Sequence, residues 1–349
     1  LEMVTEEIEE FCNESFLEGA PIIKVSSTTG EGIEEFRETL DKIVSDFHFH
    51  DVFGPFRLSV DRIFAMKGFG SVVTGTSISG RISVGEELRI YPTDQTAKVR
   101  GIQVHSDAVT EVEAGHRTAI NLQGVDVADI SRGMVLAPPE TLLSSYMLDC
   151  HFLYLASNPK PLKHRARVRI HLGTAEIIGR VSLLDRDEIE PGEEAVVQLL
   201  LENTAAVWPG DRYVVRSYSP VATIGGGMVL GNVSPRKRKR LLEPDREYNR
   251  SIQKVLLDGS IEEKVLLFLR ESRETGLNAK ELGIRLGLFG KHLKKVLNEP
   301  ISTKKMVVVD SATQRYVVVE VSERLKEMLV QHLLAYHKSN PLQPGLAKE

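Results

Sequence analysis

The feature that most constrains the fold is a change in the period of the hydrophobic residues along this 349-residue chain. Between about residues 56 and 233, apolar and polar residues alternate and glycines recur at regular turn positions. Alternation places the apolar side chains on one face of a strand, and many short strands with regular turns are typical of β-barrels or β-sandwiches. A break at Pro138 and Pro139 divides the region. We therefore predict two antiparallel β-barrels, over 51–140 and 141–235.

The first 50 residues are predicted to form the edge of an α/β layer. Apolar residues recur at helical spacing in 1–12 and again in 33–43, and the short apolar run 21–25 between them suits a buried parallel strand. Thr28 and Glu31 fit a capping box for the second helix. This pattern indicates the last strand and flanking helices of a doubly wound sheet.

Beyond residue 241 the pattern becomes helical. One apolar stripe begins at Ile261, Asn278 is placed to cap a short helix, and a third helix is expected to end before Pro300. Two strands and a further helix follow. Three helices with a two-stranded wing form a winged helix. We place a linker at 236–258, the winged helix at 259–321 and the start of a second winged helix at 322–349.

The charge is unevenly distributed. The formal net charge of −5 disfavours nucleic-acid binding by the protein as a whole, but 160–171 is a basic strip without an acidic residue. Arginines at alternate positions share one face of a strand, and salt confines each field to about 8–10 Å, so such a strip can bind phosphates on an acidic protein. A solvated strand face is the alternative. The basic run 236–240 is interpreted as an exposed linker. The strip contains Lys160, Lys163, Arg165, Arg167 and Arg169.

Composition argues against several other classes of protein. Cys12 and Cys150 are too few and too far apart for a disulfide framework, which favours a cytoplasmic location. No apolar run approaches the length of a membrane span. The ten histidines show no metal-ligand spacing, and no nucleophile–base arrangement is visible. We therefore expect neither a metal site nor catalytic residues in this chain.

Several motifs together resemble a known superfamily. DRIF at 61–64, KGFGSVVTGT at 67–76, VGE at 84–86, AGHR at 114–117 and RGMVL at 132–136 are similar to the second domain of the translational GTPases. HLGTAE at 171–176, TIGGG at 223–227 and the winged helix make the chain most similar to the bacterial selenocysteine-specific elongation factors. The resemblance covers essentially the whole chain, and it implies that 1–50 is the C-terminal remnant of a P-loop GTPase domain.

The resemblance implies GTP-dependent delivery of selenocysteyl-tRNA to a ribosome at a UGA codon marked by an mRNA hairpin. The intact protein is expected to be a monomeric, cytoplasmic GTPase that uses GTP and Mg²⁺ and contacts no membrane. The phosphate-loop pattern Gly-x-x-x-x-Gly-Lys-Ser/Thr is missing from this sequence. We therefore expect a chain truncated at both ends, which neither binds nor hydrolyses GTP and lacks the winged helix that meets the hairpin.

The resemblance also assigns site residues. The turn VSSTTGEGI at 25–33 matches the guanine-binding turn, with Ser26, Ser27 and Thr28 as its remnant. The tRNA-binding residues are the five basic residues of the strip together with His171, Gly173 and Thr174. The aminoacyl pocket comprises Asp61, Arg62, Phe64, Thr74 and Arg117.

Within this pocket, Arg117 takes a position where the general elongation factor has a neutral amide. A selenol is largely anionic at neutral pH, and a weakly hydrated guanidinium suits such an anion, with Asp61 orienting it. An ordinary surface Arg–Asp pair is the alternative.

Three other functions stay open. A general elongation factor and the GTPase subunit of an ATP-sulfurylase complex belong to the same superfamily, but neither ordinarily has a winged helix. A DNA-binding regulator built on the winged helix is opposed by the two barrels and by the acidic net charge.

Overall fold

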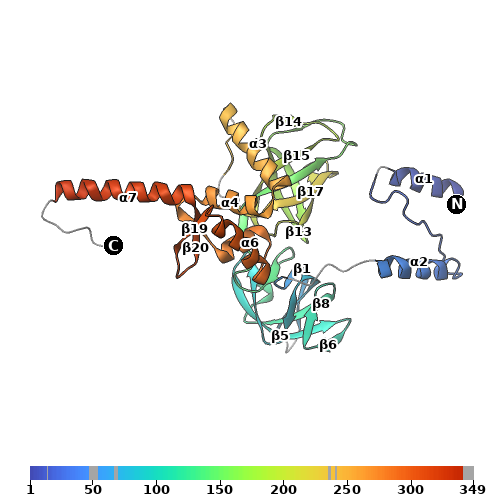
Figure 1. The fold of residues 1–349 in the computed structure, drawn as a ribbon. Helices are drawn as coiled ribbons and strands as arrows, with labels where there is room; N and C mark the ends of the chain where they lie inside the picture. The colour runs from blue at the N-terminus through green and yellow to red at the C-terminus, as the bar shows by residue number, and fades with distance from the viewer. Residues whose placement is uncertain (14, 47–53, 67–69, 235–236, 240–241, 341–349) are drawn as a thin grey trace. The chain divides into compact units, whose positions relative to one another are not determined.

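A computed structural model describes residues 1–13, 15–46, 54–66, 70–234, 237–239 and 242–340 (Figure 1). The chain divides into two compact units, residues 1–51 and 52–349, which are treated separately below. Motif residues 67–69, basic residues 236 and 240, and residues 341–349 lie outside the described residues.

The first unit contains two helices, α1 (Glu2–Cys12) and α2 (Ile33–Asp46). The predicted strand at 21–25 is wrong, because this segment has no neighbouring strand among the described residues of the unit and Val25 is 56% exposed. The predicted capping box is wrong too, since α2 begins only at Ile33. The helical stripe after residue 32 is confirmed, yet its apolar side chains are at least one-third exposed: Ile33, Phe36, Leu40 and Ile43.

The second unit begins with the predicted first barrel. Six antiparallel strands form a ring in the order β4, β9, β1, β2, β8, β5, which the β4–β5 pairing closes. Inward side chains such as Leu58, Ile90 and Leu136 are fully buried. The strands are β1 (Arg57–Met66), β2 (Gly70–Ser79), β4 (Glu87–Tyr91), β5 (Gln95–Val104), β8 (Arg117–Gln123) and β9 (Val135–Ala137), with β3 (Arg81–Ser83), β6 (Asp107–Val109) and β7 (Glu111–Glu113) beside them.

A second closed barrel follows, also as predicted, with strand order β10, β15, β13, β12, β16, β17. The sequence pattern did not reveal β17, because three of its residues are consecutive glycines. Glycine is required here because the backbone of the neighbouring strand approaches closely. A Cβ at Gly225 would overlap the Leu153 carbonyl oxygen. The strands are β10 (Ser144–Tyr154), β12 (Ala166–Leu172), β13 (Ala175–Leu183), β15 (Glu194–Ala206), β16 (Arg212–Ser217) and β17 (Thr223–Gly231), with the pair β11 (Leu162–Lys163) and β14 (Glu188–Ile189) outside the barrel.

The C-terminal module is a winged helix, as predicted. Asn278 caps α5 through a complete capping box with Glu281. The third helix does not stop before Pro300 but continues to Ser302; proline removes only one N–H group, and here it lies in the last turn with its ring buried. The elements are α3 (Glu243–Asp258), α4 (Ile261–Ser272), β18 (Leu277–Asn278), α5 (Ala279–Leu286), α6 (Gly290–Ser302), β19 (Met306–Asp310), β20 (Arg315–Val318) and α7 (Val319–Ser339).

The segment between the second barrel and the winged helix is more than a connector. Helix α3 occupies its second half, and Ile252 and Leu256 of that helix belong to one apolar cluster with Leu184 of the barrel and Phe268 of α4. Arg238 in the basic run is 6% exposed, so the prediction of an exposed linker is wrong at this residue. The barrel and the first winged helix are therefore packed together rather than tethered.

No described helix is both long enough and apolar enough to span a membrane. The described part of the chain also contains no group of three or more His, Cys, Asp or Glu side chains arranged to hold a metal ion.

Candidate functional site

A β-bulge in strand β1 places the central residue of the predicted pocket. Val60 lies opposite Gly75 and Arg62 lies opposite Thr74, so Asp61 is the extra residue between them. A bulge bends the strand locally and redirects the side chain of the extra residue. Here that side chain turns toward β2 and β8.

Three of the five predicted pocket residues meet at this bulge. Thr74 Oγ1 donates a hydrogen bond to Asp61 Oδ1 at 3.0 Å. The Arg117 guanidinium makes a two-pronged ion pair with the same carboxylate, in which Nη2 lies 3.1 Å from Oδ1 and Nη1 bonds to Oδ2. The Arg117 side chain remains 50% exposed, whereas that of Asp61 is 20% exposed. The pair therefore presents one open face of a fixed cation to solvent.

The environment of Asp61 favours the ionised carboxylate. Partial burial by itself would raise the pKa, but the hydrogen bonds from Arg117 and Thr74 and the positive charges of Arg117 and Arg62 outweigh it and lower the pKa below its usual value. Asp61 is thus negative at neutral pH and holds the guanidinium in one orientation.

Arg62 and Phe64 lie on the exposed side of β1 beyond the bulge. Arg62 acts on Asp61 through its charge, and Phe64 is 40% exposed. Neither side chain makes a hydrogen bond or ring contact within the described part of the chain. The structure therefore brings Asp61, Thr74 and Arg117 together, and leaves Arg62 and Phe64 at the rim.

The basic strip on the second barrel forms a wider surface than the sequence indicated. Arg167 and Arg169 share the outer face of β12, as predicted. Directly opposite them in the sheet lie Arg180 on β13 and Arg216 on β16. Opposed residues of antiparallel strands project from the same face, so four arginines gather on one surface. Strand register, which sequence alone does not give, was the signal needed to find Arg180 and Arg216.

An aromatic ring and two carboxylates complete this arginine surface. The Arg167 and Arg169 guanidinium carbons lie 4.5 Å and 5.5 Å from the Tyr218 ring centroid. Arg167 also makes two hydrogen bonds of 2.9 Å to Glu202, and Arg169 bonds to Glu176 at 2.5 Å. A phosphate would therefore have to compete with these partners. Aromatic rings and guanidinium planes are both groups on which RNA bases stack.

Among the remaining residues predicted to bind tRNA, His171 shares the outer face of β12 with Arg167 and Arg169, and the others are dispersed. Lys160 and Lys163 are exposed, and Lys163 lies on β11. Arg165 precedes β12 with a positive φ of 63°, so it does not continue the strand face. His171 Nε2 lies 3.7 Å from Glu176 Oε2. Gly173 and Thr174 form the turn between β12 and β13, where Thr174 Oγ1 bonds to the Val60 carbonyl oxygen at 2.6 Å.

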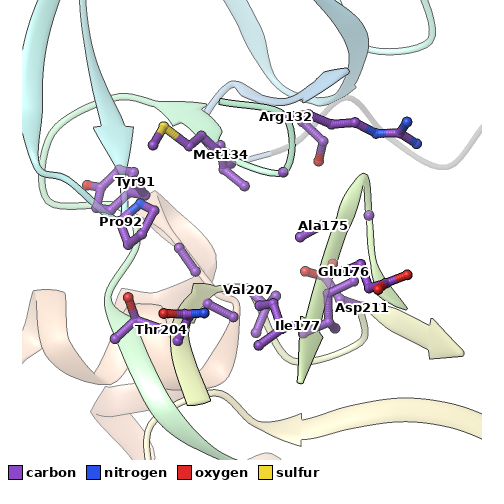
Figure 2. Close-up of a pocket in the computed structure, with 18 of the residues that line it drawn as sticks. Tyr91, Pro92, Arg132, Met134, Ala175, Glu176, Ile177, Thr204, Val207 and Asp211 are labelled. Atoms are coloured by element: carbon purple, nitrogen blue, oxygen red, sulfur yellow. The ribbon is translucent and has the colours of Figure 1, made fainter. Parts of the chain in front are cut away.

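A cavity of about 480 Å³, which the sequence did not predict, lies where the two barrels meet. Figure 2 shows Arg132 and Met134 of the first barrel on one side of it and Ala175 and Glu176 of the second barrel on the other.

An ion pair at the wall of this cavity joins the barrels. The Arg57 guanidinium donates to both carboxylate oxygens of Asp211 at 2.5 and 2.7 Å, and it lies 4.4 Å from the ring centroid of Trp208. The barrels thus meet through a partly buried, bidentate contact.

The turn predicted to bind guanine has two backbone donors without an acceptor in the part of the chain that the structure describes. Ser26 Oγ accepts the Thr29 N–H at 3.3 Å, and the Ser26 carbonyl accepts the Gly30 N–H at 2.8 Å. The backbone N–H groups of Ser27 and Thr28 have no acceptor among the described residues. The turn is therefore compatible with a base oxygen at this position.

Comparison with known proteins agrees with both barrels. The model of the "Selenocysteine-specific elongation factor, beta-barrel domain" family matches residues 150–236, and that of "Elongation factor Tu domain 2" matches residues 70–137. The selenocysteine-specific elongation factor of Desulfomicrobium baculatum is 40% identical over 350 residues, which cover 100% of this chain and 54% of that protein. Its counterpart from Escherichia coli strain K12 is 26% identical over 99% of this chain and 52% of that protein.

The fold of the chain has a counterpart among solved structures. The crystal structure of a bacterial selenocysteine-specific elongation factor aligns with a TM-score of 0.77 at 24% identity, over 97% of this chain and 52% of that one. The chain thus spans about half the length of the relatives that it matches.

Proposed function

The chain belongs to the family of selenocysteine-specific elongation factors, and on this premise we propose that it is the tRNA-holding part of a GTP-dependent factor that delivers selenocysteyl-tRNA to the ribosome. The observation that carries the proposal is the solvent-facing Arg117 guanidinium, which is fixed by Asp61, whose carboxylate also accepts a hydrogen bond from Thr74. In the proposal, the bulge in β1 forms the aminoacyl pocket and Arg117 contacts the amino-acid side chain.

Charge is the property by which such a pocket can distinguish selenocysteyl-tRNA from the same tRNA carrying serine. A serine and a selenocysteine side chain differ by one atom, and size alone discriminates weakly between such groups. A guanidinium gains energy from a selenolate and little from a neutral hydroxyl. At an effective dielectric constant of about 20, a contact near 4 Å is worth about 4 kcal/mol before desolvation. Desolvation reduces this to about 1–3 kcal/mol, or roughly 10- to 100-fold in affinity.

The test is the Arg117→Gln variant of the full-length protein in its GTP form. We expect its preference for selenocysteyl-tRNA over seryl-tRNA to fall by roughly 10- to 100-fold, with little change in affinity for the seryl form. Equilibrium binding of both charged tRNAs measures this ratio. Arg81→Gln is the matched control, because Arg81 is an exposed arginine on the same barrel that also faces a carboxylate, that of Glu111.

A different result would reassign Arg117. If the affinities for selenocysteyl-tRNA and seryl-tRNA fall equally, Arg117 holds the tRNA or the barrel and does not distinguish the amino-acid side chains. Asp61→Asn should cause a milder loss of the same preference, because Asp61 only orients the guanidinium. A larger effect at Asp61 than at Arg117 would exchange the two roles.

The tRNA body is proposed to lie on the arginine surface formed by Arg167, Arg169, Arg180 and Arg216. The four guanidinium groups outnumber the carboxylates of Glu176 and Glu202, so the surface keeps an excess of positive charge. In the proposal, phosphates of the RNA replace these carboxylates as partners of Arg167 and Arg169.

GTP and Mg²⁺ are proposed to bind the whole protein and not this chain by itself. Ser26, Ser27 and Thr28 would contact only the base; the phosphate-loop motif is missing from this sequence. Each interaction that such a motif makes with a phosphate is worth about 1.5–3 kcal/mol. Calorimetry on the 349-residue chain should therefore show GTP affinity no better than roughly millimolar. Contact with an mRNA hairpin and a monomeric state belong to the same proposal for the whole protein.

A further inference from the structure

The turn between β12 and β13 touches strand β1 at the residue before Asp61. The Val60 carbonyl oxygen accepts the Thr174 hydroxyl at 2.6 Å and the Gly133 N–H at 3.0 Å. Gly133 belongs to the first barrel and Thr174 to the second. One buried carbonyl is therefore held by a donor from each barrel.

The backbone packs closely around this carbonyl. A Cβ at Gly133 would lie 2.8 Å from the Cα of Ala175, and a Cβ at Gly173 would lie 3.0 Å from Ser59 Oγ. Arg132 Nε also donates to the Thr174 carbonyl oxygen at 3.3 Å. These contacts leave the turn little room to shift without moving β1.

The Val60 carbonyl affects Asp61 because the two belong to the same peptide group. The Val60 carbonyl and the Asp61 N–H belong to one planar peptide group, so a hydrogen bond that fixes the oxygen also fixes the plane from which the Asp61 backbone continues. Asp61 is the bulged residue, which the strand pairing leaves without an opposite partner. The direction of the Asp61 side chain therefore depends on contacts other than the strand-pairing hydrogen bonds.

From this geometry we propose that Thr174 is a positioning residue for the Asp61–Arg117 pair. Its hydroxyl fixes the Val60–Asp61 peptide and thereby aims the Asp61 carboxylate at the Arg117 guanidinium. The second barrel, proposed to carry the tRNA body, thus also sets the geometry of the pocket proposed for the aminoacyl group. The positioning rests on the structure, and only its consequence for tRNA rests on the proposed function.

This role differs from the direct tRNA contact expected of Thr174. A hydroxyl has one proton to donate, and Thr174 gives it to Val60. Donation to an RNA phosphate would require that inter-barrel bond to break. The structure therefore favours Thr174 as a residue that connects the two barrels through its hydrogen bond to Val60.

Nuclear magnetic resonance of the 349-residue chain with ¹⁵N-labelled arginine tests the positioning. The Arg117 Nε–H signal is assigned by its disappearance in Arg117→Lys. We expect this signal in Thr174→Val and in Thr174→Ala to move toward its position in Asp61→Asn, and to stay near the wild-type position in Thr174→Ser, which keeps the hydroxyl. An unmoved signal in folded Thr174→Val or Thr174→Ala would overturn the proposal.

The matched control is Thr223→Val. Thr223 lies exposed at the start of β17 in the same barrel, and its hydroxyl has no hydrogen-bond partner among the residues that the structure describes. Its substitution should leave the Arg117 signal in place. A general loosening of the barrel would instead move the signal in both valine variants, and that result would count against a specific role for Thr174.

Binding measurements on the full-length protein separate this proposal from the proposed function. Thr174→Val should reduce the selenocysteyl-over-seryl preference by roughly two- to tenfold, the range expected for removal of one hydrogen bond, and Thr174→Ser should restore it. If the Arg117 signal moves while the preference stays constant, the positioning holds and the assignment of Arg117 as the residue that recognises the amino acid fails.

Discussion

Two arginines of this chain pair with carboxylates in opposite surroundings. Arg238 bonds to Asp149 and Glu271, both at 2.6 Å, with side chains that are no more than 5% exposed. Arg117 pairs with Asp61 but is half exposed. The first cation has all its interactions inside the protein, whereas the second keeps a face for a ligand. Burial, and not the presence of an ion pair, distinguishes an arginine that holds a fold from one available for recognition.

The buried cluster also joins separate parts of the chain. Arg238 comes from the connecting segment, Asp149 from barrel strand β10 and Glu271 from helix α4. Burial by itself would lower the pKa of the Arg238 guanidinium, but the two carboxylates raise it further than burial lowers it. Three ionised groups are therefore fixed at the junction of barrel and winged helix.

Removing the buried cation should have the largest effect on stability. We expect Arg238→Met to lower the free energy of unfolding by about 3–5 kcal/mol, because two buried carboxylates lose their counter-charge. Urea denaturation measures the change. Lys239→Ala is the control, since Lys239 is the exposed neighbour of Arg238, and it should change stability by less than about 0.5 kcal/mol.

A triple variant distinguishes the cause of that destabilisation. If uncompensated charge is responsible, Asp149→Leu combined with Arg238→Met and Glu271→Met should recover much of the stability, because well-packed apolar groups can replace a buried ion cluster. If the triple variant is as unstable as the single one, the destabilisation comes from packing and the electrostatic account is wrong.

The same comparison shows what sequence patterns can predict. Alternation and turn glycines predicted both barrels, and the capping residue Asn278 correctly marked the start of α5. The basic run, however, gave no sign that its middle residue would be buried, because partners 89 and 33 residues away determine that. Long-range pairing is not visible in local charge.

The candidate site was predictable to the same extent. The motif resemblance supplied Asp61, Thr74 and Arg117, and the structure brings them together. The arginine surface was half predicted, since Arg180 and Arg216 join it only through strand register. The proposed positioning role of Thr174 could not be predicted, because it depends on how the two barrels pack against each other.

The ion pair between the barrels should have an intermediate effect. The Arg57 side chain is 10% exposed, which lies between the 2% of Arg238 and the 50% of Arg117. We expect Arg57→Lys to cost about 1–3 kcal/mol in the free energy of unfolding, because lysine cannot reproduce the bidentate bonds or the stacking on Trp208. Arg212→Lys, at an exposed arginine beside Asp211, should be nearly neutral. Equal destabilisation by the two variants in urea denaturation would refute this ranking.

The arginine surface should matter less for stability and more for RNA. Arg167 is 40% exposed and pairs with Glu202, so the double variant Arg167→Ala, Arg169→Ala should change the free energy of unfolding little, because exposed ion pairs are screened by solvent. Its tRNA affinity should depend less steeply on salt, and the log–log slope should fall by about 0.7–0.9 for each phosphate that the variant no longer neutralises. Lys237→Ala with Lys239→Ala is the control. A slope unchanged by the arginine variant would place the RNA elsewhere.

The smallest effect on stability is expected at the Asp61–Arg117 pair. Exposed ion pairs contribute about 0–1 kcal/mol, so Asp61→Asn should lower the free energy of unfolding by no more than this at pH 7.

The folded state lowers the pKa of Asp61 below the ordinary aspartate value of 3.8. Such a group stabilises the fold above its unfolded pKa and loses that contribution as the pH falls through the folded pKa. The difference between wild type and Asp61→Asn should therefore be fully present at neutral pH and shrink below about pH 4. Urea denaturation of both proteins across this range, with Asp107→Asn as an exposed control on the same barrel, isolates the carboxylate. A cost of several kcal/mol at pH 7 would mean that the pair stabilises the barrel as the Arg238 cluster does, and the contrast between recognition and structure would fail.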